Sequence, residues 1–205
     1  MEKRRGSSEL ISTVILVAVV LAMSVALWSY AQNSTAQLRD AQQVQSMLSQ
    51  SSTNLNLLLV YSDQTGLTKV LQVSFPPGSN VYVAVLGLKG NSFLLADSPQ
   101  SQSYAVFIPS GGPPISLSDS TQWSPPPNFS VQSGSVMVQP IYASDPTYYS
   151  IDLWLGSTNL RLYKLDFSSN PVILLKTQAT GQYTEVLVFF LQIDNKYWAF
   201  AYYYL

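Results

Sequence analysis

Residues 10–30 read LISTVILVAVVLAMSVALWSY, a run without a single charged side chain. A helix of this length rises roughly 30 Å, which matches the hydrocarbon thickness of a lipid bilayer. Because the run is apolar at every position of the helical repeat, it needs lipid or other helices on all sides. The stretch therefore predicts a membrane-spanning helix near the N-terminus.

Charges flank this run unequally. Lys3, Arg4 and Arg5 precede it, whereas the next charge on its C-terminal side is Arg39. Positive residues are retained on the cytoplasmic side of a membrane helix. We therefore expect the N-terminus inside the cell and everything after residue 30 outside it.

The helical pattern continues beyond the apolar run. Apolar residues recur at steps of three and four through Leu38, Val44 and Leu48, and residues 7–65 contain neither Gly nor Pro. An ordinary secretory signal has an apolar region of only about 7–15 residues. The small residues at 22, 24 and 26 could form its cleavage site, but the length of the apolar run makes such a signal the weaker interpretation. The sequence predicts one helix over residues 7–53, apolar in its first half and amphipathic in its second.

Composition excludes several classes of function. The chain has 205 residues, a net charge of −1 and 10% charged residues, so it lacks the basic surface that nucleic-acid binding requires. It has no His and no Cys, which removes Ser-His-Asp triads, cysteine nucleophiles and Cys/His zinc sites. The carboxylates, among them Asp97, show no calcium-loop spacing and are expected in turns or on the solvated surface. We expect no enzyme activity, no cofactor and no metal.

The period of the sequence changes from 3.6 to 2 after residue 61, which indicates strands. The fold class predicted is α+β: the long helix followed, over residues 54–205, by an all-β domain of the immunoglobulin-like β-sandwich type. Residues 109–130 hold six Pro and are expected to form a long surface loop. The segments 172–175 and 186–191 are expected in central strands. Strands are predicted over residues 67–75, 81–89, 92–96, 104–108, 135–142, 148–155, 160–167, 172–177, 183–193 and 197–205, with a tight hairpin at 194–196.

Two features of the β region suggest contacts with other molecules. The C-terminal strand carries six aromatic residues between 197 and 204, which fit a strand packed in the core or a surface that binds sugars. Asn33 and Asn128 each begin an Asn-x-Ser/Thr sequon and are candidate N-glycosylation sites, Asn128 being the better exposed beside the Pro-rich loop.

The first fifty residues resemble a known family. Lys3-Arg4-Arg5-Gly6, followed by Ser7, an acidic Glu9 and the apolar run, is similar to the class III signal peptide of archaeal type IV pilins and archaellins. The resemblance implies that a class III signal peptidase cuts between Gly6 and Ser7, so that residues 1–6 are a leader and the helix stays in the mature chain. It also implies an assembly ATPase and a membrane platform protein as partners. Bacterial type IV pilins have an acid at the fifth mature position that pairs with a neighbouring N-terminal amine. Glu9 would be the third mature residue here. Besides such pairing, a second interpretation is that Glu9 stabilises the N-terminal turn through the helix dipole.

These observations lead to one expected function and two alternatives. The expected function is a structural subunit of an extracellular filament, a homo-oligomer held by its N-terminal helices, in which Ala18, Ala22 and Ala26 allow close packing. Its precursor would reside in the cytoplasmic membrane, and the filament would serve adhesion or aggregation. One alternative is a membrane-anchored, non-polymerising component of the filament machine, such as a stator or minor pilin. The other is a signal-anchored module that binds surfaces.

Overall fold

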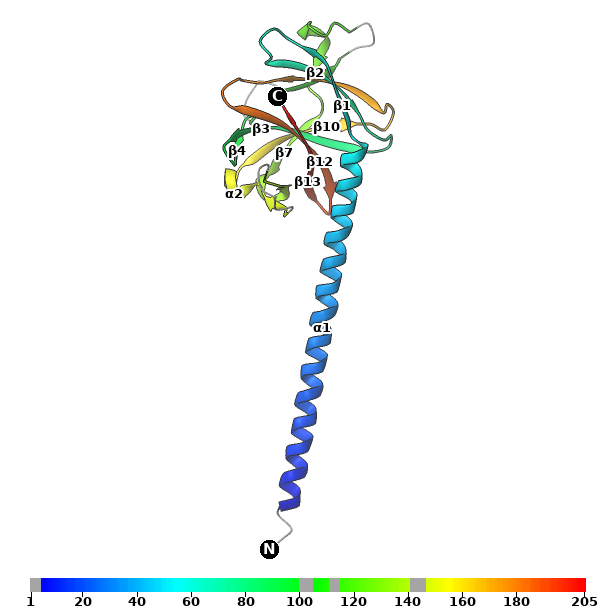
Figure 1. Ribbon diagram of the computed structural model, residues 1–205, viewed down its shortest axis with the longest axis vertical. Coiled ribbons are helices and arrows are strands. Elements are labelled where there is room, and N and C mark those ends of the chain that lie inside the picture. The colour runs from blue at the N-terminus through cyan, green and yellow to red at the C-terminus, as the bar shows by residue number, and fades with distance from the viewer. Residues whose placement is uncertain (1–4, 100–104, 111–114, 141–146) are drawn as a thin grey trace. The chain divides into compact units, whose positions relative to one another are not determined.

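Figure 1 shows the computed structural model of the chain, in which a long helix precedes a domain built of strands. The structure describes residues 5–99, 105–110, 115–140 and 147–205, and of residues 5–12 and Gln37 it describes the backbone alone. The α+β class expected from the sequence is confirmed.

The helix α1 (Arg5–Asn54) runs without a break, as the lack of Gly and Pro after residue 6 predicts. Its last turn passes directly into a strand, and the Leu55 N–H still donates to the Ser51 carbonyl at 3.0 Å. The chain divides into two compact units, Met1–Ser46 and Met47–Leu205. The second unit thus begins inside α1, earlier than the boundary expected at residue 54, and it includes Leu48, which is buried.

The β-domain contains two sheets, and all but one of the strand pairs in them are antiparallel. The smaller has the order β1 (Asn56–Ser62), β2 (Thr68–Ser74), β11 (Val172–Gln178), β5 (Val106–Pro109) and β6 (Trp123–Ser124). The larger has the order β7 (Asn128–Gln132), β10 (Asn159–Asp166), β3 (Asn80–Lys89), β12 (Thr184–Ile193), β13 (Lys196–Tyr204), β8 (Val136–Val138) and β9 (Tyr149–Ser150), with β4 (Ser92–Leu95) also paired to β3. The pair β13–β8 is parallel.

The core of the domain lies on both faces of β3 and β12, whose interior residues are almost all buried. The segment 186–191 is central as expected, since β12 lies between β3 and β13. The segment 172–175 belongs to β11, which lies between β2 and β5, but among the described residues β5 pairs only with Lys176 and Thr177, so 172–175 pairs on the β2 side alone. One face of β3 packs through Tyr82, Ala84 and Leu86 against Phe93 and Phe190. The predicted hairpin is also present: Asp194 and Asn195 both have positive φ, as a tight two-residue turn between strands requires.

Four sequence-based expectations were wrong in detail. Residues 56–62 form β1 although no strand was predicted there. The Pro-rich segment is not one loop, because it contains the short 3₁₀ helix η1 (Ser120–Gln122), β6 and the start of β7. The strand predicted over 148–155 is instead β9 and a single helical turn, α2 (Asp152–Leu155), which ends at Gly156 with a φ of 68°. The strand predicted over 135–142 is the shorter β8, which follows the 3₁₀ turn η2 (Ser133–Ser135). Residues 141–142 of that prediction, and residue 104 of the segment that forms β5, lie outside the described residues.

Candidate functional site

The apolar part of α1 is exposed all around the helix. Val14, Ile15, Leu16 and Val17 are each between 50% and 66% exposed. Successive residues turn by about 100°, so these four consecutive side chains point to all sides of the helix. Within the described part of the chain, α1 alone is long and apolar enough to cross a membrane, and its most apolar window has a mean hydropathy of 2.3. A membrane anchor and a signal sequence share this property.

Two hydroxyl groups of α1 form hydrogen bonds within the helix. The Ser24 hydroxyl donates to the Val20 carbonyl at 2.8 Å, one turn earlier. Farther along, the Thr35 hydroxyl donates to the Ala31 carbonyl at 2.7 Å. Such bonds let a hydroxyl enter an apolar environment without an unpaired donor. The Ser24 bond therefore suits the apolar stretch to lipid or to packing against other helices.

Ala18, Ala22 and Ala26 follow one another at steps of four residues and are all exposed. Side chains four residues apart lie on one side of a helix, so these three form a strip of small residues along α1. Small residues let the backbones of two apolar helices approach closely. The strip is the part of α1 best shaped for contact with another helix.

The structure places the residues of the expected leader only in part. Lys3 and Arg4 lie outside the described residues, and Arg5 is the first residue of α1. Gly6, Ser7 and Glu9 follow within the helix, with only their backbone described. The cut between Gly6 and Ser7 and the pairing of Glu9 therefore stay predictions.

The two sequons have different backbone conformations. Asn128 is the exposed first residue of β7, and its amide group donates to the Pro126 carbonyl at 3.3 Å. Ser130, two residues later, is exposed on the same face of the strand. Asn33 is exposed on α1, where two residues of helix turn Thr35 by about 200°, to nearly the opposite side. Only the sequon at Asn128 presents its amide and its hydroxyl together.

The C-terminal aromatic residues mostly pack within the domain. Tyr197 and Phe200 are buried, and Trp198 packs edge-on against Tyr148 with ring centroids 5.3 Å apart. The Tyr202 hydroxyl accepts from the Gln139 N–H at 3.0 Å, and burial raises the pKa of Tyr202. Tyr204 is the aromatic residue of this strand that is exposed, at 45%. The strand is therefore mainly a packing element.

A buried ion pair joins distant parts of the larger sheet. The Arg161 guanidinium lies 3.1 Å from the Asp97 carboxylate, and the Tyr163 hydroxyl donates to the other carboxylate oxygen. Burial raises the pKa of Asp97, and the hydrogen bond from Tyr163 and the charge on Arg161 offset that rise only in part. The expectation of a solvated Asp97 was wrong. No local pattern could reveal the pair, because its partners are 64 residues apart in the sequence.

This ion pair lies where two strands meet end to end. One edge of β3 is shared by β10, which pairs with residues 80–83, and by β4, which pairs with residues 86–89. Asp97 follows β4, and Arg161 and Tyr163 belong to β10. Backbone pairing cannot continue across such a junction, so side-chain bonds join the two strands there. The network has a structural explanation and needs no catalytic role.

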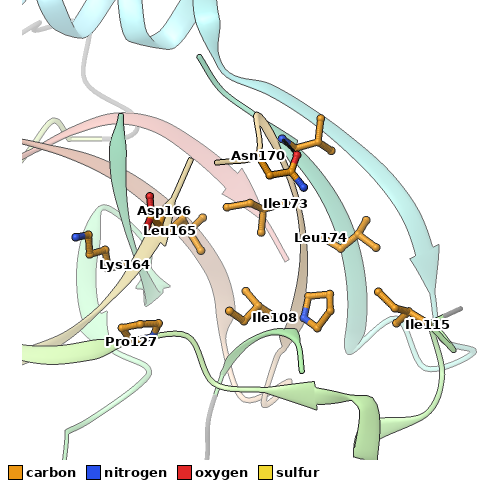
Figure 2. Close-up of a pocket in the computed structure, with 11 residues that line it drawn as sticks. Ile108, Ile115, Pro127, Lys164, Leu165, Asp166, Asn170, Ile173 and Leu174 are labelled. Atoms are coloured by element: carbon orange, nitrogen blue, oxygen red, sulfur yellow. Dashed lines mark hydrogen bonds between the residues drawn. The ribbon is translucent and has the colours of Figure 1, made fainter. Parts of the chain in front are cut away.

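A cleft of about 420 Å³ opens beside β11 (Figure 2). Its lining is mainly apolar and comes from both sheets: Ile108, Pro109, Ile115, Pro127, Lys164, Leu165, Asp166, Asn170, Val172, Ile173 and Leu174. Asp166 and Asn170 are both engaged locally, because their side-chain oxygens accept the backbone N–H groups of Ser168 and Val172 at 2.9 and 3.0 Å. The cleft offers apolar contact and does not bring together groups suited to acid–base chemistry. Sequence reasoning missed it.

The sequence matches no protein-family model and no curated protein, and the structure matches no solved structure.

Proposed function

We propose that this chain is the structural subunit of an extracellular, type IV pilus-like filament that polymerises through α1. One observation carries the proposal: the apolar residues 13–30 are exposed on every side of a helix that continues without a break to Asn54. A simple membrane anchor needs about 20 residues and no helical extension beyond the bilayer. A filament core of packed helices needs both parts.

The proposed assembly follows from the order of segments along the chain. The precursor inserts with Lys3, Arg4 and Arg5 in the cytoplasm, and a class III signal peptidase cuts between Gly6 and Ser7. An assembly ATPase and a membrane platform protein then move the subunits out of the lipid. Helices replace lipid around α1 at little hydrophobic cost, because both surroundings are apolar, and the strip Ala18, Ala22 and Ala26 permits close packing.

The β-domain forms the outer surface of the proposed filament and serves adhesion or aggregation. Its surface is almost free of charge, since only 10% of the chain is Asp, Glu, Lys or Arg. Neutral hydrogen-bonding side chains keep their state as pH changes, which suits a surface exposed to varying surroundings. Two roles are open to Glu9 in the proposed filament. One is pairing with a neighbouring subunit's N-terminal amine, because a carboxylate within an apolar bundle needs a cationic partner, and the other is stabilisation of the first helical turn through the helix dipole.

The test is to shear cells that express the full chain, sediment the released material, and determine its N-terminal sequence and intact mass. We expect filaments whose chain begins at Ser7. A chain that begins at Met1 and stays in the membrane fraction would contradict the proposal and favour a surface-binding module. A chain cut at Gly6 that stays in the membrane would favour a non-polymerising component of the filament machine.

A further inference from the structure

The strand β1 is an open edge with an unusual surface. It is the first strand of the smaller sheet, and within the part of the chain that the structure describes it pairs with β2 alone. Three consecutive apolar residues are exposed on it: Leu58 at 57%, Leu59 at 47% and Val60 at 42%. Exposed edge strands are normally protected by charges or proline, and β1 has neither. Such an edge favours pairing with another strand.

The ladder shows which backbone groups of β1 are open. Asp63 N–H donates to the Thr68 carbonyl, so Thr68 and alternate residues of β2 point toward β1. Through the pairs Asn56↔Ser74 and Leu58↔Gln72, the residues of β1 that point toward β2 are 56 and 58. Leu57 and Leu59 therefore direct their N–H and C=O groups outward, two residues apart.

A second open edge lies on β11, on the other side of β2. Among the described residues, pairing between β11 and β5 covers Lys176↔Phe107 and Thr177↔Val106 alone. Continuing that register would place Pro109 against Leu174, and proline has no N–H to donate. The strand β5 instead leaves β11 and pairs with β6. The cleft of Figure 2 opens at this divergence.

The open part of β11 offers backbone groups with the same spacing as β1. Gln178 N–H donates to the Ala105 carbonyl, so residues 178, 176, 174 and 172 point toward β5. The Val172 N–H already donates to the side-chain oxygen of Asn170. The Val172 carbonyl and both backbone groups of Leu174 face the side that β5 has left. Around them, Ile108, Ile115 and Leu174 supply apolar contacts.

We propose that β1 of one copy enters the cleft of a second copy and continues its smaller sheet at β11. The two edges lie on opposite sides of the block β1–β2–β11, so each copy both gives and receives a strand. Such a head-to-tail contact forms an open chain of copies instead of a closed dimer. It uses strand addition, in which backbone bonds give affinity and the side chains that fill pockets give specificity.

The chemistry of both surfaces selects a second copy as the occupant. No charged residue occurs in β1, nor in β11 between Val172 and Leu175, so both contact surfaces are neutral. On the β10 side of the cleft, Lys164 and Asp166 carry opposite charges, and hydrogen bonds from Ser168, with a smaller contribution from the charge on Lys164, lower the pKa of Asp166. A neutral apolar strand fits this cleft, whereas a charged peptide would lose its hydration without gaining a partner.

The size of the contact ties it to assembly. A few residues of β1 and one small cleft bury less than the roughly 800 Å² per partner that a standard stable interface needs. The contact therefore forms between copies that α1 already holds together, and β1 follows α1 after a single residue. The inference thus rests on the proposed filament function. Within the filament, the strand contact fixes one subunit against the next.

Cross-linking tests this contact directly, because the chain has no Cys and a single introduced cysteine can be labelled alone. Filaments are prepared from a mixture of ¹⁵N-labelled wild-type chain and unlabelled Leu58→Cys chain that carries a benzophenone maleimide. After irradiation, peptides linked between ¹⁵N and unlabelled chains are identified by mass spectrometry. We expect links to the peptides that contain residues 108–115 and 172–174. Leu153→Cys, an exposed leucine on α2 that does not line the cleft, is the matched control and should not give them.

A reverse probe covers the case in which the label at position 58 blocks assembly. Ile115→Cys, labelled in the same way, should link to residues 56–62 of another copy. Adding Leu58→Lys should reduce this link by about tenfold or more, since a buried leucine is replaced by a charge. Asn56→Lys, on the same face of β1 but already polar and exposed, should leave the link unchanged.

The outcomes separate the inference from the proposed function. Filaments that form normally while links from positions 58 and 115 avoid the cleft and β1 would overturn the strand contact and leave the filament function intact. Links from position 58 only to lipid or to α1 would assign β1 to those partners and also overturn it. Absence of any filament fraction from the wild-type chain would overturn both.

Discussion

At the scale of single residues, Arg161 is the side chain whose loss we expect to cost most. Its guanidinium is buried against Asp97, and removal of one partner leaves the other charge buried alone. We predict that Arg161→Leu lowers the free energy of unfolding by about 3–5 kcal/mol. Denaturant titration of the full chain, followed by tryptophan fluorescence, measures the change.

Two controls accompany this prediction. Lys196→Leu removes an exposed cation and should change the free energy by no more than about 0.5 kcal/mol. The double variant Asp97→Asn/Arg161→Leu should recover part of the loss, because no buried charge remains. An Arg161→Leu chain as stable as the wild type would show that the ion pair does not stabilise the fold.

The sequons give a second prediction at this scale. We expect Asn128 to carry an N-linked glycan and Asn33 to carry none, because only Asn128 and Ser130 are exposed together on one face of a strand. Peptide mass spectrometry of the secreted chain measures the occupancy of both sites. Asn128→Gln should remove the whole excess mass, and Asn33→Gln should remove none. Equal occupancy of both sites would show that backbone conformation does not decide between them.

Residue-level features were predictable from sequence only where their signal is local. The sequons and the alanines of α1 can be found in the sequence because each pattern lies within a few residues. The pair Asp97–Arg161 and the position of Pro109 opposite Leu174 depend on strands that are distant in the sequence. Their roles appear only once the pairing of β10, β5 and β11 is known.

At the scale of elements, the success of the sequence reasoning followed the strength of the periodic pattern. The helix α1 was predictable because residues 7–54 contain neither Gly nor Pro and their apolar side chains fit a helix throughout. The strand β1 was missed because NLLLVYS does not alternate: both faces of this edge are exposed, and a bulge at Val60 shifts the register. The cleft was missed for a different reason: its lining comes from segments that are far apart in the sequence.

The strip on α1 gives the prediction for this scale. Ala22→Leu enlarges a side chain at the proposed helix contact while keeping the segment apolar. We expect the amount of filament recovered by shearing to fall several-fold, with unchanged insertion in the membrane. Val20→Leu, an enlargement on the opposite side of the helix, should leave filament recovery unchanged. Equal filament yield from both variants would exclude close packing at Ala22.

At the scale of the whole molecule, the response to pH follows from the titratable groups that the chain has. It contains no His, so no side chain with an ordinary pKa near 6.5 is available, and it contains 13 Tyr. Burial raises the pKa of Tyr148 to about 12 and also raises those of Tyr163 and Tyr202. The folded chain keeps these protons where the unfolded chain, with an ordinary pKa of 10.0, loses them.

We therefore predict a free energy of unfolding that is nearly constant from about pH 6 to 9 and falls above about pH 10. The stabilisation from the raised tyrosine pKa values is complete below 10 and is lost as pH rises through the value of about 12 for Tyr148. Denaturant titrations across this range measure the slope, and absorbance at 295 nm follows tyrosine ionisation. Complete ionisation near pH 10 with the fold intact would contradict the burial of these hydroxyls.

The end-to-end junction of β4 and β10 also affects how fast the molecule unfolds. Asp97 and Arg161 meet only after β10 has paired with β3, which closes a loop of more than sixty residues. Contacts of such long sequence separation are costly in chain entropy and are expected to form late, after the folding transition state. Loss of the ion pair should then leave the refolding rate nearly unchanged and accelerate unfolding. The bond between the two abutting strands would thereby slow the unfolding of the β-domain and lengthen the lifetime of its folded state.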